Sequence, residues 1–169
     1  MDDQPCVRDL SELVRLHSGL LYRYAYRLSG SVADAEDLTQ QAFLIAHRKL
    51  DQLREAAHAK GWLCAIVRTA YLKAVRKEAA ADVVSLERVS DIEETPPSDV
   101  PLDSEELQQF LNELSEEFRT PLILYYFQEF SYKEIARQME VPLGTVMSRL
   151  ARAKAQLRKR LAACQPVDR

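Results

Sequence analysis

Residues that interrupt helices are scarce in this chain, since its 169 residues include only four glycines and seven prolines. The apolar residues recur at helical spacing nearly throughout, which predicts an all-α fold. Cysteine is also scarce: the three cysteines lie far apart, and no CxxC pair or Cys/His cluster has the spacing of a zinc site. This pattern excludes a disulfide framework and favours a reduced, cytoplasmic protein.

Long apolar runs are absent as well. No run approaches the ~20 residues that are needed to cross a membrane, and the N-terminal stretch MDDQPCVRDL lacks the apolar core of a signal peptide. The sequence also has no constellation of nucleophile, metal ligands or acid–base pair. We therefore predict a protein that is not embedded in a membrane, is not an enzyme, and uses no cofactor, metal or small-molecule substrate.

Charge is distributed unevenly along the chain, although the net charge is only −3. Residues 79–117 contain 1 basic and 12 acidic residues, whereas residues 118–169 contain 10 basic and 4 acidic residues. Residues 82–103 combine many acids with three prolines and have no sustained period, which predicts a flexible acidic linker. We therefore expect two small helical domains, 1–80 and 104–169, joined by a linker at 81–103.

The stretch 131–161 has the pattern of two helices joined by a tight turn. Ser131 and Glu134 form a capping-box pair at the start of the first helix. Pro142 predicts that this helix stops near Glu140, because proline disfavours a helical residue before it. The second helix has an apolar stripe at helical spacing, formed by Val146, Leu150, Ala153 and Leu157. Short helix, turn and longer helix together predict a helix-turn-helix.

Positive charge dominates the second of these helices. Residues 144–162 contain six basic and no acidic residues, so the like charges repel one another unless a polyanion lies nearby. A solvated basic face near a helix C-terminus is the alternative interpretation. Because a turn precedes it, the helix favours DNA binding, in which its N-terminal residues enter the major groove and its cations contact phosphates.

Five more helices are predicted upstream. Three lie at about 6–28, 31–51 and 59–80, with Gly30 suited to the left-handed end of the first and Ser31 to the cap of the second. The second has an acidic outer surface, which is either a solvated face or a docking surface. The third has aromatic residues beside basic ones, which suits unstacked nucleic acid and equally suits a packed core with solvated cations. Two further helices, near 107–114 and 118–127, are expected to support the helix-turn-helix, with Pro121 in the first turn of the latter and Tyr126 among its apolar residues.

Three stretches, in this order, resemble those of the extracytoplasmic-function sigma factors, the smallest specificity subunits of bacterial RNA polymerase. The polymerase-binding helix of that family is similar to DAEDLTQQAFLIAHR (34–48). Its promoter-melting helix is similar to KGWLCAIVRTAYLKAVRK (60–77), and its upstream-element domain to FRTPLILYYFQEFSYKEIARQMEVPLGTVMSRLARAKAQLRKRL (118–161). The resemblance covers about residues 8–80 and 104–162, and it implies a function in promoter recognition and melting at transcription initiation.

The resemblance implies two contact surfaces in the N-terminal domain. The clamp helices of the polymerase β′ subunit would be bound by an acidic and apolar set, namely Asp34, Glu36, Asp37, Leu38, Gln40, Gln41 and Phe43. The minus-ten promoter element would be held by residues 51–58 and by a basic and aromatic set, namely Lys60, Trp62, Arg68, Thr69, Lys73, Arg76 and Lys77.

In the C-terminal domain, the resemblance implies a surface that recognises the minus-thirty-five element and also contacts the β flap of the polymerase. The residues nearest the bases would be Thr145, Met147, Ser148, Ala151 and Arg152. The DNA backbone would be held by Arg149 and Lys154, with further phosphate contacts from Tyr132 and Lys133. The family also implies an anti-sigma partner, commonly membrane-anchored, that covers the same faces.

The chain departs from the family pattern at four of these positions. Gln41 stands where glutamate is usual, Thr69 where asparagine is common, and Lys73 where aspartate is common. Met147 replaces a frequent basic residue and favours apolar contact, for example with a thymine methyl group. Two other functions remain open: a stand-alone helix-turn-helix regulator that binds an operator without polymerase, and a sigma mimic that only sequesters an anti-sigma protein.

Overall fold

The structure is a computed structural model that describes residues 9–81 and 104–164, with side chains described for residues 9–81 and 105–160. In this part of the chain seven α-helices and two short 3₁₀ helices form the fold and no strand occurs, which confirms the predicted all-α class. Contacts divide the chain into two compact units, Met1–Val100 and Pro101–Arg169. Nearly all of the predicted linker, residues 82–103, lies outside the described residues. The predicted limits of the two domains therefore stay predictions.

The N-terminal unit contains three long helices, α1 (Leu10–Ser29), α2 (Val32–Arg48) and α3 (Ala59–Ala81), with the 3₁₀ helices η1 (Leu50–Gln52) and η2 (Ala56–His58) before α3. The polar connection predicted at 51–58 therefore has local helical turns. Both 3₁₀ helices are short. They form the connection in which the chain turns from α2 into α3.

Local capping fixes the ends of α1 and the start of α2. The Asp9 carboxylate accepts a hydrogen bond from the Ser11 N–H at 3.0 Å, so α1 begins after Asp9, whereas the predicted start near residue 6 lies outside the described residues. Gly30 ends α1 in the left-handed conformation, with φ of 71°, as predicted. Ser31 caps α2 by accepting a hydrogen bond from the Asp34 N–H at 3.3 Å.

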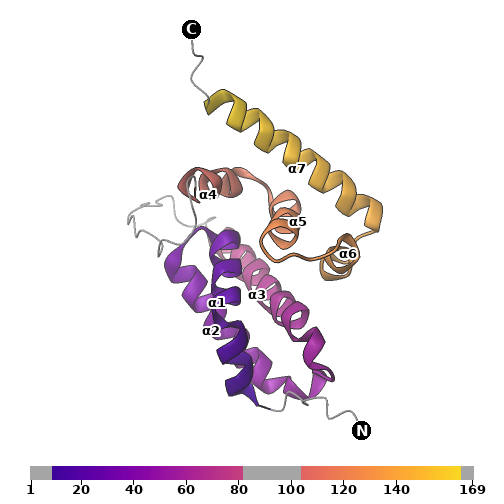
Figure 1. Ribbon diagram of the computed structural model, residues 1–169. Coiled ribbons are helices and arrows are strands. Elements are labelled where there is room, and N and C mark those ends of the chain that lie inside the picture. Colours follow the sequence, from indigo (N-terminus) through magenta and orange to yellow (C-terminus); the bar gives the residue numbers. More distant parts are fainter. Residues whose placement is uncertain (1–8, 82–103, 165–169) are drawn as a thin grey trace. The chain divides into compact units, whose positions relative to one another are not determined.

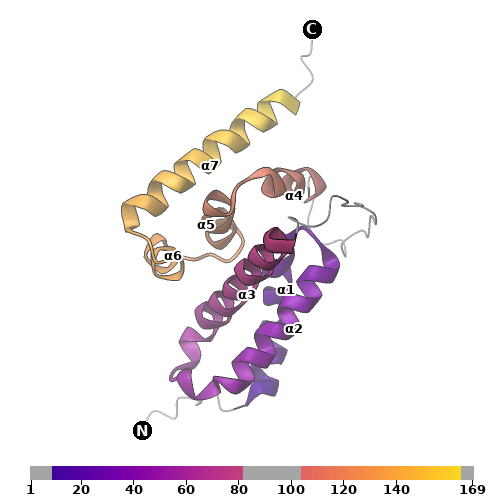
Figure 2. The same ribbon diagram turned by 180° about the vertical axis from the view of Figure 1, so that it is seen from behind.

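The three long helices pack side by side in a bundle (Figures 1 and 2). The buried stripe of α3 runs through Cys64 and Val67, whereas the aromatic residues Trp62 and Tyr71 are half-buried. Burial raises the pKa of the Cys64 thiol to about 12. The bundle core is formed by Leu13, Leu21, Tyr24, Leu28, Ala35, Leu38, Ala42, Ala46, Leu63, Cys64, Val67 and Ala70.

The C-terminal unit contains four helices, α4 (Ser104–Glu113), α5 (Glu116–Tyr126), α6 (Tyr132–Met139) and α7 (Leu143–Cys164). Helix α7 packs against both α5 and α6, and α5 also contacts α6. The Arg119 guanidinium donates to the backbone carbonyls of Asn112 and Leu114 at 2.9 and 2.7 Å, which satisfies carbonyls at the end of α4. The core of this unit includes Phe110, Leu111, Leu122, Ile123, Leu124, Ile135, Val146, Leu150 and Ala153.

Helix α5 differs from the prediction at both ends. The Ser115 carbonyl accepts hydrogen bonds from the N–H groups of Phe118 and Arg119 at 3.0 and 2.9 Å. The helix therefore begins at Glu116, and Pro121 lies in its second turn rather than its first. Tyr126, predicted among the apolar residues of this helix, is 51% exposed, whereas residues 120–124 are buried.

Helices α6 and α7 form the predicted helix-turn-helix. The capping box at Ser131 and Glu134 is present, with the Glu134 carboxylate accepting from the Ser131 N–H at 2.7 Å. Helix α6 ends at Met139, and Glu140 follows in the left-handed conformation, with φ of 54°. The Pro142 carbonyl then accepts hydrogen bonds from the N–H groups of Thr145 and Val146. These bonds begin α7. The turn thus combines a left-handed residue with a proline, and the proline agrees with the predicted end of the first helix.

Candidate nucleic-acid interface

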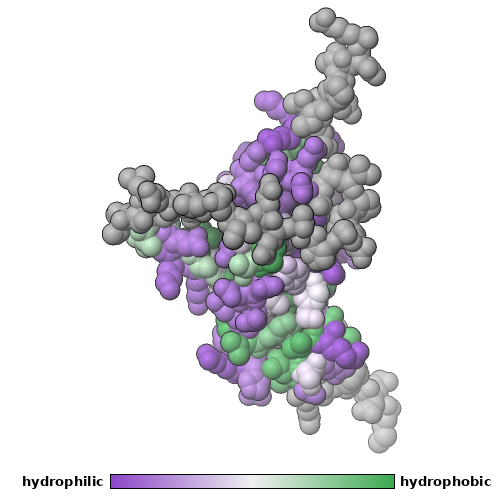
Figure 3. Space-filling view, turned by 90° about the vertical axis from the view of Figure 1, so that its left-hand side faces the viewer, coloured by the Kyte–Doolittle hydropathy of each residue, from purple (hydrophilic) through white to green (hydrophobic). Residues whose placement is uncertain are grey.

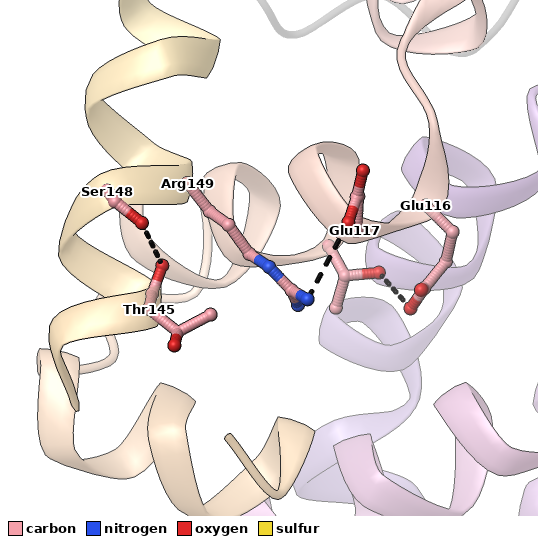
Figure 4. Close-up of polar contacts among 6 residues, drawn as sticks. Glu116, Glu117, Thr145, Ser148 and Arg149 are labelled. Carbon is pink, nitrogen blue, oxygen red and sulfur yellow. Dashed lines mark hydrogen bonds and ion pairs between the residues drawn. The ribbon is translucent and has the colours of Figure 1, made fainter. Parts of the chain in front are cut away.

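Helix α7 presents a polar surface opposite its buried stripe. Val146, Leu150 and Ala153 are buried, so the helical period directs the intervening side chains outward. Among the residues predicted to lie nearest the bases, Thr145 is half-buried, whereas Met147, Ser148, Ala151 and Arg152 are exposed. The Ser148 hydroxyl donates to the Thr145 carbonyl at 3.1 Å (Figure 4), which keeps part of its hydrogen-bonding capacity within the helix.

One flank of α7 is tied to α4 and α5 by ion pairs. Arg149 extends toward α5, where its Nη2 lies 3.6 Å from Oε2 of Glu117 (Figure 4). Arg160, further along the same flank, donates from Nη1 to Oε2 of Glu113 at 2.7 Å. Arg149, predicted to hold the DNA backbone, therefore has a carboxylate partner within its own unit. It would have to share or exchange that partner in order to contact a phosphate.

The opposite flank of α7 faces three tyrosines. The Tyr125 ring lies 5.0 Å from the Tyr126 ring and 5.2 Å from the Tyr132 ring, measured between centroids. Lys154 places its Nζ 5.2 Å from the Tyr125 centroid and 5.5 Å from the Tyr126 centroid, within the range of cation–π attraction. Hydrogen bonding with the Tyr126 side chain is the main cause that raises the pKa of Lys154.

A shallow groove of about 270 Å³ lies on this flank and is lined by Tyr132, Met147, Leu150, Ala151, Lys154 and Arg158. It brings together four residues that were predicted separately as base or phosphate contacts, on α6 and α7. Sequence reasoning missed Tyr125, Tyr126 and Arg158. The sequence did contain a signal for Arg158: its position continues the helical spacing of Met147, Ala151 and Lys154, so all four side chains lie on one stripe of the helix.

The residues predicted to dock on polymerase lie on α2. Asp34, Glu36, Asp37, Gln40 and Gln41 are exposed and form its outer surface, and Phe43 is half-buried. Leu38 is only 4% exposed and belongs to the bundle core, although it lines the same hollow as Asp34, Asp37 and Gln41.

Leu44 is not part of the predicted docking set, and the structure leaves it 60% exposed. It follows Gln40 and Gln41 by four and three residues, so it continues the outer surface of α2. The N-terminal unit has further apolar exposure at Val14, Leu16 and Val75, and Figure 3 shows apolar side chains among polar ones on one face of this unit, in the lower half of the view.

The residues predicted to hold the minus-ten element lie along α3. Lys60, Trp62 and Arg68 are half-buried, and Thr69, Lys73, Arg76 and Lys77 are exposed. The Thr69 hydroxyl donates to the Ala65 carbonyl at 2.8 Å, so one of its hydrogen-bonding groups is engaged by the helix itself.

Two hollows between α2 and α3, of about 440 and 590 Å³, connect this surface with the predicted docking surface. Asp34, Asp37 and Gln41 line the first hollow, and Gln41 lines the second together with Thr69, Lys73 and Lys77. Sequence reasoning treated the two sets as separate, whereas the fold makes them neighbours.

Among residues 9–81 and 104–164, no group of three or more His, Cys, Asp or Glu side chains is placed to hold a metal ion. None of the helices described combines the length and the apolar character that crossing a membrane requires.

Comparison with known proteins assigns both units. The family model described as Sigma-70 region 2 matches residues 13–81, and the model described as Sigma-70, region 4 matches residues 104–157. The ECF RNA polymerase sigma factor SigE of Mycolicibacterium smegmatis is 37% identical over 166 residues, which cover 95% of this chain and 64% of that protein. The chain thus spans slightly less than two thirds of that relative.

Two further similarities cover more of the matched protein. The ECF RNA polymerase sigma factor SigM of Mycobacterium tuberculosis is 34% identical over 151 residues, covering 89% of this chain and 76% of SigM. The solved structure of the sigma factor RpoE from Bartonella quintana, in complex with the anti-sigma factor NepR, has a TM-score of 0.78 and 30% identity, and covers 96% of this chain and 100% of RpoE. This chain therefore belongs to the ECF family of RNA polymerase sigma factors.

Proposed function

We propose that this chain binds core RNA polymerase, directs it to specific promoters and helps to open them at initiation. The observation that carries the proposal is the presence, on two separate helical units, of an exposed acidic surface on α2 and a helix-turn-helix whose α7 exposes Met147, Ser148, Ala151 and Arg152. The family membership of both units supports the same assignment. In this proposal the polymerase performs the chemistry and the chain is not an enzyme.

The N-terminal unit would dock on the β′ clamp helices through the outer surface of α2. Asp34, Glu36 and Asp37 would meet a basic partner surface, which speeds association through electrostatic steering. Gln40, Gln41 and the half-buried Phe43 would complete the contact, with Leu44 as an apolar extension. Because long-range attraction between exposed charges is screened within ~8 Å at physiological ionic strength, this association should weaken as salt increases.

The minus-ten element would be held along α3, next to the docking surface. Arg68, Arg76 and Lys77 would contact phosphates, and Lys60 and Lys73 would add positive charge. Trp62 and Tyr71 have half-buried rings, and rings in that position can stack on a base that has left the duplex. The shared hollow between α2 and α3 would couple polymerase docking to the capture of unpaired DNA.

The C-terminal unit would read the minus-thirty-five element with α7 in the major groove, and would meet the β flap. Met147 would make apolar contact with a thymine methyl group, and Arg152 would contact a base edge. Tyr132, Lys133 and Lys154 would hold the backbone. An anti-sigma protein is a further expected partner; the matched RpoE structure is a complex with the anti-sigma factor NepR.

Run-off transcription tests the proposal directly. The purified chain and core RNA polymerase are mixed with a pool of genomic promoter fragments, and transcripts are mapped at their 5′ ends. Specific transcripts that require the chain are expected, and their start sites give both promoter elements. Binding to DNA without binding to core would instead favour a stand-alone regulator, and binding to core without any transcript would favour a sigma mimic.

A further inference from the structure

Helix α1 exposes a leucine and an arginine on the side that is turned away from the bundle core. Leu16 is 55% exposed, and Arg23 is also exposed. Since these residues are seven apart, they lie on one stripe of the helix, about 10 Å from each other along its axis. Gly19 lies between them, and a Cβ at Gly19 would meet the Arg23 guanidinium, with Nη1 at 3.4 Å. The stripe therefore combines an apolar side chain with a cation, and the residue between them has no side chain to hold a partner away.

Helix α2 carries the same pattern with the opposite charge. Asp37 is exposed, and Leu44, seven residues further on, is 60% exposed. The charge precedes the leucine on α2, whereas the leucine precedes the charge on α1. In an antiparallel pair of these helices, Leu16 would therefore face Leu44 and Arg23 would face Asp37. A single exposed leucine is ordinary on a protein surface, but a match of both spacing and charge between two helices is a feature that the bundle core does not explain.

One more turn of each helix fits the same register. Glu12 comes four residues before Leu16 on α1, and Arg48 comes four residues after Leu44 on α2. Each extends its stripe by one turn, so the antiparallel pairing would also bring Glu12 opposite Arg48. Arg48 is exposed and Glu12 is half-buried. Three positions therefore match between the two helices: a charge pair, a leucine pair and a second charge pair of reversed sign.

The two stripes lie at the same level of the bundle. Helix α1 ends at Ser29 and α2 begins at Val32, so the two helices are antiparallel neighbours (Figures 1 and 2). The two leucines are each about four turns from this connection, and Arg23 and Asp37 are each about two turns from it. Among the residues that the structure describes, no ion pair involves Arg23 or Asp37. Both charges are therefore available to a partner.

A second copy of this unit supplies the complement of both stripes. Two-fold rotation about an axis parallel to the helices keeps every residue at its level in the bundle. This rotation can place α1 of one copy against α2 of the other, so that each contact is made twice, as in an isologous dimer. At both contacts a leucine meets a leucine and an arginine meets an aspartate. The surface is therefore complementary to itself in apolar character and in charge.

We propose that the N-terminal unit associates with a second copy of this chain, with α1 of each copy packed antiparallel on α2 of the other. The dimer covers Asp37 and Leu44, which belong to the outer surface of α2 that the proposed function assigns to polymerase docking. Self-association and binding to core polymerase therefore exclude each other. This consequence rests on the proposed function, whereas the dimer itself does not.

Sedimentation equilibrium of the full chain, without polymerase or DNA, tests the dimer. The average mass should rise from that of a monomer toward that of a dimer as the concentration increases, and the association should weaken as salt is added. Arg23→Glu and Asp37→Lys each place like charges opposite one another at both contacts. Either change should therefore raise the dissociation constant of the dimer by more than about tenfold. Arg137→Glu makes the same charge change on α6 and should associate like the wild type.

Mixing the two charge variants tests the register. In a dimer of Arg23→Glu with Asp37→Lys, the new glutamate of one chain meets the new lysine of the other, and the second contact keeps the native Arg23 and Asp37. An equimolar mixture should therefore form dimers although neither variant does so alone. Thermal unfolding verifies that both variants are folded. Leu16→Gln should weaken the wild-type dimer, and no charge variant should restore it.

A wild-type chain that stays monomeric at every concentration would overturn the inference. So would a dimer that persists in both charge variants, because another surface would then hold it, or an equimolar mixture that stays monomeric. Core polymerase added to the wild-type dimer should give complexes with one chain per core, and two chains per core would contradict the exclusion. If the monomeric Arg23→Glu variant does not bind core at all, the proposed function fails while the result on self-association stands.

Discussion

Arg149 of α7 and Glu117 of α5 form an ion pair between side chains that lie far apart in the sequence, with Nη2 3.6 Å from Oε2 (Figure 4). The Arg149 side chain is 23% exposed and that of Glu117 is 52% exposed. The pair therefore holds a cation of the helix-turn-helix against its supporting helix at a partly solvated position. Any contact of Arg149 with a phosphate would therefore depend on Glu117.

Glu117→Gln should release the Arg149 guanidinium for phosphate contact. The free energy of unfolding should fall by less than ~1 kcal/mol, because partly exposed ion pairs contribute little. The salt slope of promoter binding should become steeper by about 0.9, as expected for one additional phosphate contact. Glu116→Gln is the matched control, since it makes the same charge change but Glu116 accepts a hydrogen bond from Thr120 at 2.9 Å. Equal slopes for both variants would show that Arg149 does not take part.

Arg152→Ala should reduce discrimination between correct and altered minus-thirty-five elements. Arg152 is exposed opposite the buried stripe of α7, and a base-edge contact contributes about 1–3 kcal/mol of discrimination. The measurement is a competition assay between duplexes that differ at single base pairs. Lys159→Ala, an exposed cation further along α7, should weaken binding without changing the preference. An unaltered preference in the Arg152 variant would contradict the orientation proposed for α7.

Asp37→Lys should weaken binding to core polymerase, because it reverses the charge at the centre of the acidic surface on α2. The residue is exposed, so the folded state should be little affected. Association with core can be followed with a fluorescently labelled chain in the absence of DNA. Glu105→Lys makes the same charge change on α4 and should bind core normally. If both variants bind equally well, the docking surface lies elsewhere.

Cys64 should resist thiol reagents while the protein is folded. Burial raises the pKa of its thiol to about 12, so at pH 8 almost no thiolate is present, and the thiolate is the reactive form. A variant with Cys6→Ser and Cys164→Ser leaves Cys64 as the remaining thiol. Iodoacetamide should label it only after denaturant is added. Rapid labelling of the native protein would show that the N-terminal bundle opens easily.

Glu140→Gly should stabilise the C-terminal unit. Glu140 has φ of 54°, a left-handed conformation that costs a residue with a Cβ about 1–2 kcal/mol and costs glycine little. Part of that gain is offset by the greater freedom of glycine in the unfolded chain, so an increase of about 0.5–1 kcal/mol in the free energy of unfolding is expected. Glu140→Ala removes the same charge without relieving the backbone and should show no gain. Urea denaturation measures both.

Much of the candidate site follows from sequence, because the interactions that position it are local. The capping box of Ser131 and Glu134 involves residues three apart, and Gly30 ends α1 through its own backbone conformation. Likewise, the buried stripe of α7 follows from the spacing of Val146, Leu150 and Ala153 alone. These features are enough to predict the all-α class and the helix-turn-helix, and their order along the chain carries the resemblance to the sigma family.

Other features depend on which face each helix turns toward its neighbours. α2 packs against both α1 and α3, and the rotation that satisfies both buries Leu38 and leaves Leu44 60% exposed. The spacing of Ala35, Leu38, Ala42 and Ala46 indicates which side of α2 faces inward, and the two neighbouring helices decide how far the residues at the edges of that side are covered. Helix α3 likewise packs against two helices, α1 and α2, and its rotation leaves Trp62 and Tyr71 half-buried.

The sequence by itself determined the order of the helices, the side-chain caps that begin α2 and α6, and which cations α7 carries. Only the tertiary structure decided which groups those cations contact, since α7 meets α5 on one flank through Glu117 and on the other through Tyr125 and Tyr126. The reason is physical: caps and helical stripes involve neighbours within a few residues, whereas the environment of Arg149 and of Lys154 is created by a helix that lies more than twenty residues away in the chain.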